Sequence, residues 1–600
     1  MNSTSKPNSF STGLRQNEPF PLKAIIFLFA FLALFHLACL PLSELRASDE
    51  SIYAAIAGDM LQNGHYLQPH FDGVPCQSFV LYPWLTLLCS GFHLPTTVTV
   101  RLPALLSTFG LAILAGVIAA RHRDRRAGWT AAMITLTCFA TLRIGIVAQT
   151  ETLHAFLLAA AWFWLYEYGP QKQRWQLAWG GALAMVFLDT LNVGIKAPIL
   201  FYLPLLVTPM PPRMRRQLQH SAHIGWLVSF ALLFYLWVQL ICHQPVIGWN
   251  AFPGNTAGGD ESFLAHFLTF PIKCILYTMP WGVLVWTPFC LGLRPLEPPG
   301  SISGFLRALV ICPFVCYWLL PGHSPLFLLC SLAPLAILIS FHAQVVLHRY
   351  DLAYNRLMNF FGFLSIAAVL LCALFWLAVA AGRIQIMPAI DALPPANLWL
   401  TALAIAVVSA LVAWRALTTM LRGHQEFKAA WIACAARFAY AAIALPLFFV
   451  TLQDRRYVAQ LLRSELPPPG IADAPLPEEN FSTCQEEIGT VYLLGSGSSY
   501  PAQMFYLGRP IKRISHLAEE LPRNEEVVYL LARSQPLLSD RSWTQLSPPV
   551  NMNLLREFHL ELQGAGLDFN GIITRRPTDN PDLPRYQPPD FLRLYRGKKI

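Results

Sequence analysis

Long apolar runs alternate with short polar turns over the first three quarters of this 600-residue chain. A run of about 20 apolar residues is long enough to cross the hydrocarbon core of a bilayer as a helix, and the pattern predicts about 13 such helices. They are expected over residues 22–42, 98–120, 128–147, 152–168, 176–193, 197–210, 222–242, 271–293, 303–320, 325–346, 357–381, 398–418 and 431–451. The first run ends without a small-residue cleavage site, so it is expected to stay in the protein as a helix.

Three regions follow from this pattern. Residues 1–21 are expected to form a cytoplasmic segment, 22–451 a transmembrane domain with a first outer loop at 44–97, and 452–600 a soluble domain. Within the outer loop, 51–61 is expected to form a short interfacial helix. The tail has strand-like runs at Thr490–Leu494 and Glu526–Leu531, bounded by turn residues. The fold class expected is a polytopic α-helical membrane protein with a C-terminal extracytoplasmic α/β domain.

The distribution of charge supports a membrane protein and fixes an orientation. Only 13% of residues are charged, about half the usual fraction of a soluble protein. Although the formal net charge is +9, the basic residues gather in alternate turns, such as Arg121–Arg126 and Arg213–Arg216. This is the positive-inside pattern, and it argues against a nucleic-acid partner. It places the N-terminus in the cytoplasm and the tail outside.

Five polar residues in the outer turns are candidates for chemistry. Asp49 and Glu50 directly follow the first apolar run, where a carboxylate in a partly dry cleft can act as a base; a plain helix N-terminus is the commoner explanation. Glu151 is an acidic group at a membrane boundary, or an ordinary loop carboxylate. Lys196 can bind a phosphate or extend its ammonium to the interface. His323 can touch an anionic headgroup, although a solvated loop histidine is more common.

Metal-binding motifs are absent from the sequence. Most of the 13 cysteines lie within apolar runs, where a thiol packs as a small hydrophobic group. Neither a CxxC pair nor a Cys/His metal spacing occurs. No metal ligands are therefore assigned from the sequence.

The first outer loop resembles that of a known family. The resemblance rests on Asp49-Glu50-x-x-Tyr53-Ala54-x-Ile56-Ala57-x-x-Met60-Leu61-x-x-Gly64 and Pro69-His70-Phe71-Asp72-Gly73-x-Pro75, followed by Arg101-Leu102-Pro103, Thr150-Glu151, Lys196-Ala197-Pro198, Met279-Pro280-Trp281 and Phe505–Pro510. These segments resemble lipid-linked-sugar glycosyltransferases of GT-C architecture, in particular the aminoarabinose lipid A transferases and the dolichyl-phosphate-mannose-protein mannosyltransferase (protein O-mannosyltransferase) group. The first loop is the most specific part of this likeness.

The resemblance implies a glycosyltransferase of the bacterial inner membrane. Such enzymes move a sugar from a polyprenyl phosphate, such as undecaprenyl phosphate, to an envelope acceptor, which would be lipid A, a glycan or a protein. Asp49 would be the catalytic base, with Glu50 and Glu151 as further acidic groups. Tyr53, Tyr82, Arg101, Lys196 and His323 would bind substrate, with Lys196 covering the charge of the leaving phosphate. The resemblance implies no certain cofactor and leaves a divalent metal open.

Several departures from the family pattern leave alternatives open. Where relatives carry Glu-Lys-Pro-Pro, this chain has the segment Cys76–Phe79, without the lysine expected to hold donor phosphate. Ile52 replaces an arginine, and Gly322-His323 replaces a Ser-Lys pair. A catalytically impaired relative that binds lipid-linked glycans or assists a partner enzyme is therefore the main alternative. A transporter is a third class, although no internal repeat supports it.

Overall fold

The structure is a computed structural model, and it describes the membrane region in ten segments and the tail in six. The described residues are 49–71, 74–75, 80–145, 147–207, 218–241, 263–297, 302–320, 328–349, 351–381 and 395–422, then 491–494, 511–514, 527–532, 541–546, 550–551 and 591–599, with a few single residues. The expected spans at 22–42 and 431–451 and the candidate His323 lie outside this description. Asp49 is described through its backbone only.

Most of the expected spans in the described part of the chain are helices. They are α4 (Thr97–His122), α7 (Thr150–Tyr166), α8 (Trp175–Val193), α9 (Lys196–Val207), α11 (Ser221–Ile241), α13 (Ser303–Leu319), α14 (Leu329–Arg349), α15 (Asp351–Ala380) and α17 (Pro395–Arg422). Among the described helices, α4, α11 and α15 each contain a segment that is long and apolar enough to cross a membrane. Several shorter apolar helices pack beside them.

Two expected spans are wrong as continuous helices. The run 128–147 forms α5 (Arg125–Thr137) and α6 (Phe139–Ile144), which are broken at Cys138. The run 271–293 lies partly in α12 (Phe263–Tyr277), after which the chain bends by 110° into the short turns η3 (Trp281–Leu284) and η4 (Thr287–Phe289). A further short turn, η5 (Leu291–Leu296), follows.

The two breaks meet and satisfy each other's polar groups. The Phe139 amide donates to the Met279 carbonyl at 2.8 Å, and the buried Trp281 indole donates to Thr137 Oγ1 at 2.8 Å. Backbone groups within a bilayer need such partners, because water is not there to replace them. The Met279-Pro280-Trp281 element therefore joins two interrupted helices in the core.

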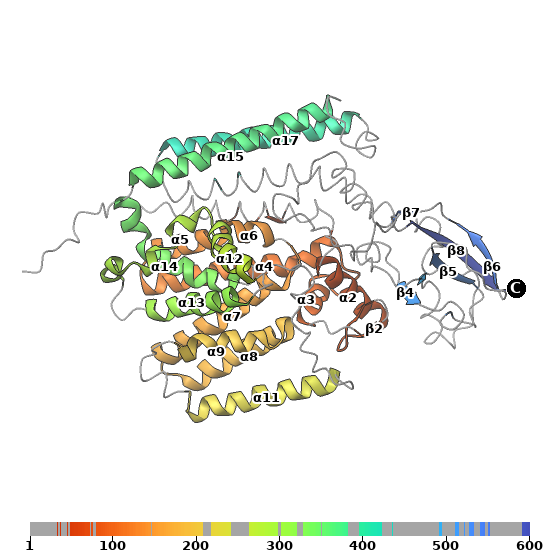
Figure 1. Cartoon of the computed structure of the whole chain (residues 1–600), viewed down its shortest axis with the longest axis horizontal. Helices are drawn as coiled ribbons and strands as arrows, with labels where there is room; N and C mark the ends of the chain where they lie inside the picture. Colours follow the sequence, from red (N-terminus) through yellow and green to blue (C-terminus); the bar gives the residue numbers. More distant parts are fainter. Residues whose placement is uncertain are drawn as a thin grey trace, which may run out of the picture.

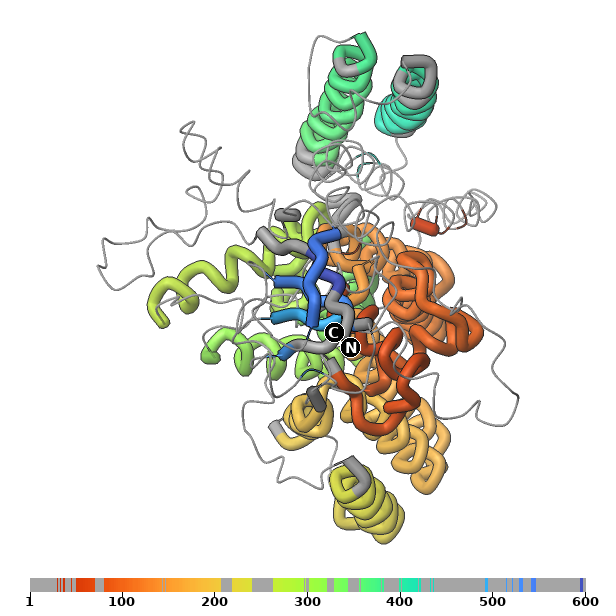
Figure 2. The backbone as a smooth tube through the Cα atoms, turned by 90° about the vertical axis from the view of Figure 1, so that its right-hand side faces the viewer, coloured from red at the N-terminus to blue at the C-terminus, as the bar shows by residue number. Residues whose placement is uncertain are grey.

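The core of the bundle is formed by α4, α5, α7, α8 and α14 (Figure 1). The crossing of α4 and α5 is tight because Gly116 and Gly128 face each other. A Cβ on Gly128 would lie 2.7 Å from the Gly116 carbonyl oxygen and from Ala120 Cβ. Small residues of this kind let membrane helices approach closely and pack well. The pair α15 and α17 lies along one side of the bundle, and α11 lies on the opposite side (Figures 1 and 2).

The first outer loop is folded against one end of the bundle. It contains α2 (Asp49–Asn63), which confirms that the expected segment 51–61 is helical, a two-stranded antiparallel hairpin of β1 (His70–Phe71) and β2 (Val74–Pro75), and α3 (Leu81–Cys89). The apolar face of α2, with Ala54, Ile56 and Met60, is buried against α3 and α4. The loop is thus part of the folded structure at this end.

The described tail residues form a mixed sheet beyond α2 and α3, at the right of Figure 1. Its strands are β3 (Val491–Leu494), β4 (Ile511–Ile514), β5 (Val527–Ala532), β6 (Arg541–Gln545), β7 (Val550–Asn551) and β8 (Phe591–Lys599). Their order is β4-β3-β5-β8-β6, with β7 also paired to β8. The first three strands are parallel and β8 is antiparallel to its neighbours. Both strand predictions, at 490–494 and 526–531, are confirmed by β3 and β5.

Candidate functional site

Glu50 lies at the centre of the contacts between the first outer loop and the bundle. Its Oε1 accepts from Arg101 Nε at 2.5 Å and its Oε2 accepts from an Arg101 terminal nitrogen at 3.2 Å. The Ala148 amide also donates to Oε1, at 3.2 Å. Both charged side chains are buried, with exposures of 0% and 3%. Glu50 therefore fastens the N-terminal end of α2 to α4 and to the turn that precedes α7.

This anchoring determines where Asp49 lies. Asp49 is the first residue of α2, so its backbone is held beside the start of α7 by its neighbour Glu50. Tyr53 comes one helical turn later and shares the same face of α2 as Asp49. The geometry favours a structural role for Glu50, because its carboxylate already accepts three hydrogen bonds from buried groups. Asp49 remains the candidate base.

Glu151 and Lys196 meet at the same end of the bundle. Glu151 lies in the first turn of α7, and Lys196 is the first residue of α9. The carboxylate charge of Glu151 acts on the buried Lys196 ammonium, which is 7% exposed. Lys196 reaches this position through a turn at Gly194, whose φ of 72° is in the left-handed region that favours glycine. An acidic and a basic group thus converge from two helix N-termini.

The two candidate tyrosines differ in accessibility. Tyr82 on α3 is fully buried, and its hydroxyl donates to the Val100 carbonyl at 3.0 Å. Burial raises the pKa of Tyr82 well above its ordinary value, and the negative charge of Glu50 raises it further. Tyr53 packs beside it, with ring centroids 5.3 Å apart, and is only half-buried. Tyr82 supports the loop, whereas Tyr53 remains available to a substrate.

A buried acid–base pair beneath Glu151 was not anticipated from the sequence. His154 Nδ1 lies 2.7 Å from Asp189 Oδ2, and the two side chains are 3% and 0% exposed. Asn192, one turn further along α8, donates to the Thr150 carbonyl at 3.1 Å. These contacts fix the N-terminus of α7 against α8, directly below Glu151. The signal was available, because an aspartate within an apolar helix is costly unless it is paired.

An apolar cavity lies next to these polar groups. It has a volume of about 240 Å³ and lies between α12, α13 and α14, with Tyr277, Phe314 and Leu332 among its lining residues. Tyr317 follows Phe314 by one turn on α13, and its backbone carbonyl accepts from His266 Nε2 at 3.1 Å. Tyr317 also lies within the electrostatic reach of Asp189 and Glu151. The apolar cavity therefore lies one turn along α13 from a tyrosine that is influenced by the charges of Asp189 and Glu151.

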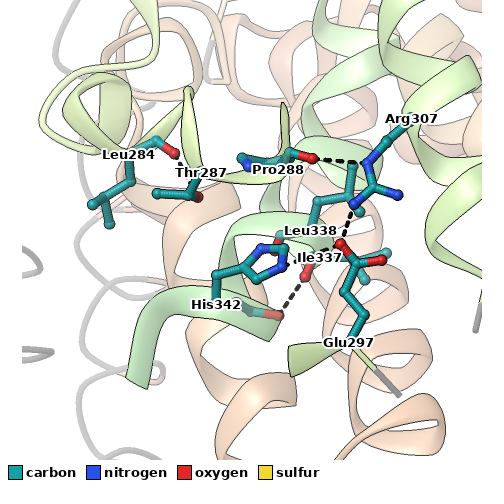
Figure 3. Close-up of polar contacts among 9 residues, drawn as sticks. Leu284, Thr287, Pro288, Glu297, Arg307, Ile337, Leu338 and His342 are labelled. Carbon is teal, nitrogen blue, oxygen red and sulfur yellow. Dashed lines mark hydrogen bonds and ion pairs between the residues drawn. The ribbon is translucent and has the colours of Figure 1, made fainter. Parts of the chain in front are cut away.

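A second set of charged residues closes the other end. Arg307 binds Glu297 and donates to the Pro288 carbonyl, and His342 Nε2 lies 3.2 Å from Glu297 (Figure 3). Nearby, Glu167 at the end of α7 pairs with His122 at 3.0 Å. Glu151 lies in the first turn of α7 and Glu167 directly follows its last residue, 16 residues later, which is about 24 Å at 1.5 Å per residue. That separation approaches the thickness of a bilayer core, roughly 30 Å.

The structure brings together most of the residues expected at the site. Glu50 pairs with Arg101, and Tyr53 packs beside Tyr82, whose hydroxyl is influenced by the charge of Glu50; Glu151 and Lys196 interact electrostatically at the same end. Among the described residues, no group of three metal-ligating side chains occurs at this place. The described residues of the expected site therefore contribute charged side chains and two aromatic rings.

Comparisons with known proteins agree with this architecture. An undecaprenyl phosphate-alpha-4-amino-4-deoxy-L-arabinose arabinosyl transferase from Erwinia tasmaniensis is 26% identical over 364 residues, covering 58% of this chain and 64% of that protein. A second protein of this description, arabinosyl transferase 2 from Sodalis glossinidius, is 27% identical over 361 residues, which again cover 58% of this chain and 64% of that protein. The chain thus matches just under two thirds of the length of these relatives. No family model matches it.

The solved structures extend the likeness to the whole fold. The crystal structure of ArnT from Cupriavidus metallidurans bound to undecaprenyl phosphate gives a TM-score of 0.63 at 15% identity, covering 96% of this chain and 98% of the other. The apo form gives 0.61. The resemblance that the first outer loop carries, to polyprenyl-phosphate-dependent GT-C glycosyltransferases, is confirmed, and this chain has the fold of ArnT.

Proposed function

We propose that this protein is a glycosyltransferase that moves a sugar from an undecaprenyl-phosphate-like donor to a hydroxyl of an envelope acceptor. The observation that carries the proposal is the anchoring of α2 by Glu50, which holds Asp49 at the outer end of the bundle where Glu151 and Lys196 meet. The names of the sequence relatives favour an amino sugar as the group transferred. Lipid A is the acceptor we favour over a glycan or a protein.

Donor binding divides between the charged and the apolar parts of the site. The Lys196 ammonium would bind the donor phosphate, because a buried cation interacts more strongly with an anion than an exposed one does. The isoprenoid chain would lie in the apolar cavity that Phe314 and Leu332 line. Tyr53 would contact the sugar, since it is half-buried on the face of α2 that also carries Asp49.

The reaction needs one base and one stabilised leaving group. The Asp49 carboxylate takes the proton from the acceptor hydroxyl, and the hydroxyl oxygen attacks the anomeric carbon from the side opposite the phosphate. The new carbon–oxygen bond forms as the bond from the anomeric carbon to the phosphate oxygen breaks. The lipid phosphate then leaves with both bonding electrons, and Lys196 stabilises its charge. The negative charge of Glu151 favours the charged form of Lys196 and so opposes part of the cost of burying its ammonium.

The test is a transfer assay with the purified full chain in lipid nanodiscs. Donors with different sugars on undecaprenyl phosphate are supplied with lipid A, and the product is identified by its added mass. Asp49→Asn should lower the transfer rate by about 100-fold or more, as expected for loss of a general base. Donor binding should persist in that variant.

A matched control shows whether a lower transfer rate reflects loss of the catalytic base or merely the replacement of any aspartate by asparagine. Asp124 caps α5 at the opposite end of the bundle, where its Oδ1 accepts from the Ala127 amide at 2.7 Å. Asparagine caps helices as well as aspartate does, so Asp124→Asn should transfer at the unmodified rate. If the unmodified protein binds donor yet transfers no sugar to lipid A, glycan or protein acceptors, it is the impaired relative that the altered segment 76–79 suggests.

The proposed chemistry also requires an orientation in the bacterial inner membrane. Residues 1–21 and the charged layer around Glu297 and Glu167 would face the cytoplasm, and the domain 452–600 would face the periplasm and cover the site. A cysteine introduced at Ser542, an exposed-edge position of β6, should react with an impermeant maleimide added to intact spheroplasts. Reaction only after the membrane is broken would contradict this orientation.

A further inference from the structure

Three potential metal ligands gather at the far end of α2, away from the proposed transfer site. Asp59 lies in the last turns of α2, His65 follows the helix, and His70 begins β1. Each offers one ligand atom, and these atoms lie within 4.8 Å of one another. Asp59 is ten residues beyond Asp49, which is about 15 Å along the helix. The cluster is therefore separate from the proposed base.

Two of the ligand atoms already have the spacing of a coordination shell. Asp59 Oδ2 lies 3.2 Å from His65 Nδ1, a separation at which the two atoms also form a hydrogen bond. Zinc bonds to oxygen and nitrogen of about 2.0–2.1 Å in a tetrahedron place neighbouring ligand atoms about 3.3 Å apart. The other carboxylate oxygen of Asp59 accepts from Asn63 Nδ2 at 2.7 Å. That hydrogen bond orients the carboxylate so that Oδ2 faces the histidines.

The third ligand, His70, is held in the tautomer that coordination requires. Its Nδ1 lies 2.8 Å from the Gln68 carbonyl oxygen, which can only accept, so Nδ1 carries the proton. The lone pair is then on Nε2. Metal-binding histidines commonly donate their other ring N–H to a carbonyl in this way. The His70 ring also stacks on the His65 ring, with centroids 3.9 Å apart.

We propose that Asp59, His65 and His70 bind a divalent transition-metal ion, with Zn²⁺ as the preferred occupant. Two imidazoles and one carboxylate suit zinc, whereas Ca²⁺ and Mg²⁺ favour shells made of oxygen. Three protein ligands leave one tetrahedral position open. Since the His65 side chain is 42% exposed, water or an anionic group can enter that position.

The ion would tie together parts of the first outer loop that the chain links only through a short turn. The turn begins at Gly64, whose φ is 73°, and Trp84 Nε1 on α3 donates to the Tyr66 carbonyl at 2.8 Å. A metal bridging Asp59 to His70 would fix the end of α2 to the β1–β2 hairpin. Metal binding is therefore expected to reduce the mobility of residues 64–71.

Zinc binding is measured on the full chain in nanodiscs, purified with a tag that contains no histidine. After chelation and reloading with Zn²⁺, the retained metal is counted by mass spectrometry for the unmodified protein, Asp59→Asn, His65→Ala and His70→Ala. The matched control is His93→Ala, because His93 is an exposed histidine of the same outer loop, outside the cluster.

The unmodified protein and His93→Ala should each retain about one zinc more than the three cluster variants, whose affinity should fall at least about 10-fold. Hydrogen exchange at residues 64–71 should slow when zinc is added to the unmodified protein and stay unchanged in His70→Ala. Variants are compared only if they elute as folded protein; His70→Gln replaces His70→Ala otherwise. Equal zinc retention in the unmodified protein and the cluster variants would overturn the proposal, whatever the outcome of the transfer assay.

Discussion

The buried ion pair between Glu50 and Arg101 should contribute strongly to stability, and Arg101→Met tests this. The substitution introduces an apolar side chain of similar length but leaves the Glu50 carboxylate buried at 0% exposure, without the guanidinium charge that balances it. Removing one partner of a buried pair costs about 3–5 kcal/mol. If the whole cost falls on the unfolding barrier, 3 kcal/mol corresponds to roughly 150-fold faster unfolding.

The assay measures the rate of unfolding and not an equilibrium free energy, because large membrane proteins seldom unfold reversibly. The buried thiol of Cys138, which is 0% exposed, becomes reactive to a maleimide only when the core opens, and its labelling is followed by mass spectrometry. Arg121→Met is the matched control. Arg121 is 56% exposed and lies 3.4 Å from Glu167, so its loss should cost less than about 1 kcal/mol.

A double variant shows whether the cost arises from the stranded charge. Glu50→Gln combined with Arg101→Met leaves no charge behind and retains an amide oxygen for the Ala148 N–H. Its labelling rate should return close to that of the Arg121→Met control, because neutral replacement of a buried ion pair is often tolerated. The reasoning is refuted if Arg101→Met labels no faster than the control, or if the double variant labels as fast as Arg101→Met.

Two further predictions concern glycines. Gly128→Val should destabilise the α4–α5 crossing by about 1–3 kcal/mol, since its Cβ would lie 2.7 Å from Ala120 Cβ. Gly58→Ala in α2 is the control: a Cβ there meets nothing within 4 Å, so this variant should be as stable as the unmodified protein or more stable. Thermal inactivation in nanodiscs distinguishes these outcomes, and equal stability of the two variants would contradict the packing argument. Gly194→Ala should cost about 1–3 kcal/mol, because the backbone at Gly194 has φ 72° and ψ −149°, a region that is used almost only by glycine. It should also weaken donor binding by displacing Lys196, and unchanged affinity would count against the placement of that lysine.

The sequence predicted the existence of the helices better than their continuity. Apolar composition identifies a buried segment, but it does not reveal where hydrogen bonding is interrupted. The breaks at Cys138 and at Met279–Trp281 lie inside apolar runs, so a count of apolar residues passes over them. The polar groups exposed by one break form hydrogen bonds with those of the other. These residues lie more than 130 positions apart in the sequence, so no local pattern reveals the contact.

The candidate site was predicted in outline, but the roles of its members were not. Asp49 and Glu50 are equivalent in the sequence, and only the position of Arg101, 51 residues later, distinguishes the anchored carboxylate from the candidate base. The His154–Asp189 pair was missed because each residue stands alone in an apolar run. The cluster around His65 was missed because its ligands match no standard motif and converge only when the end of α2 meets the hairpin.

The central claim is that Lys196 holds the phosphate of a lipid-linked sugar at the outer end of the bundle. The most direct test compares undecaprenyl phosphate binding, by native mass spectrometry, between the unmodified protein, Lys196→Met and Lys172→Met. Lys172 lies in the exposed turn between α7 and α8 at the opposite end. Losing a charge-assisted hydrogen bond of about 1.5–3 kcal/mol should weaken binding roughly 10- to 100-fold for Lys196→Met, with Lys172→Met unchanged. Equal affinity of Lys196→Met and the unmodified protein would contradict the account.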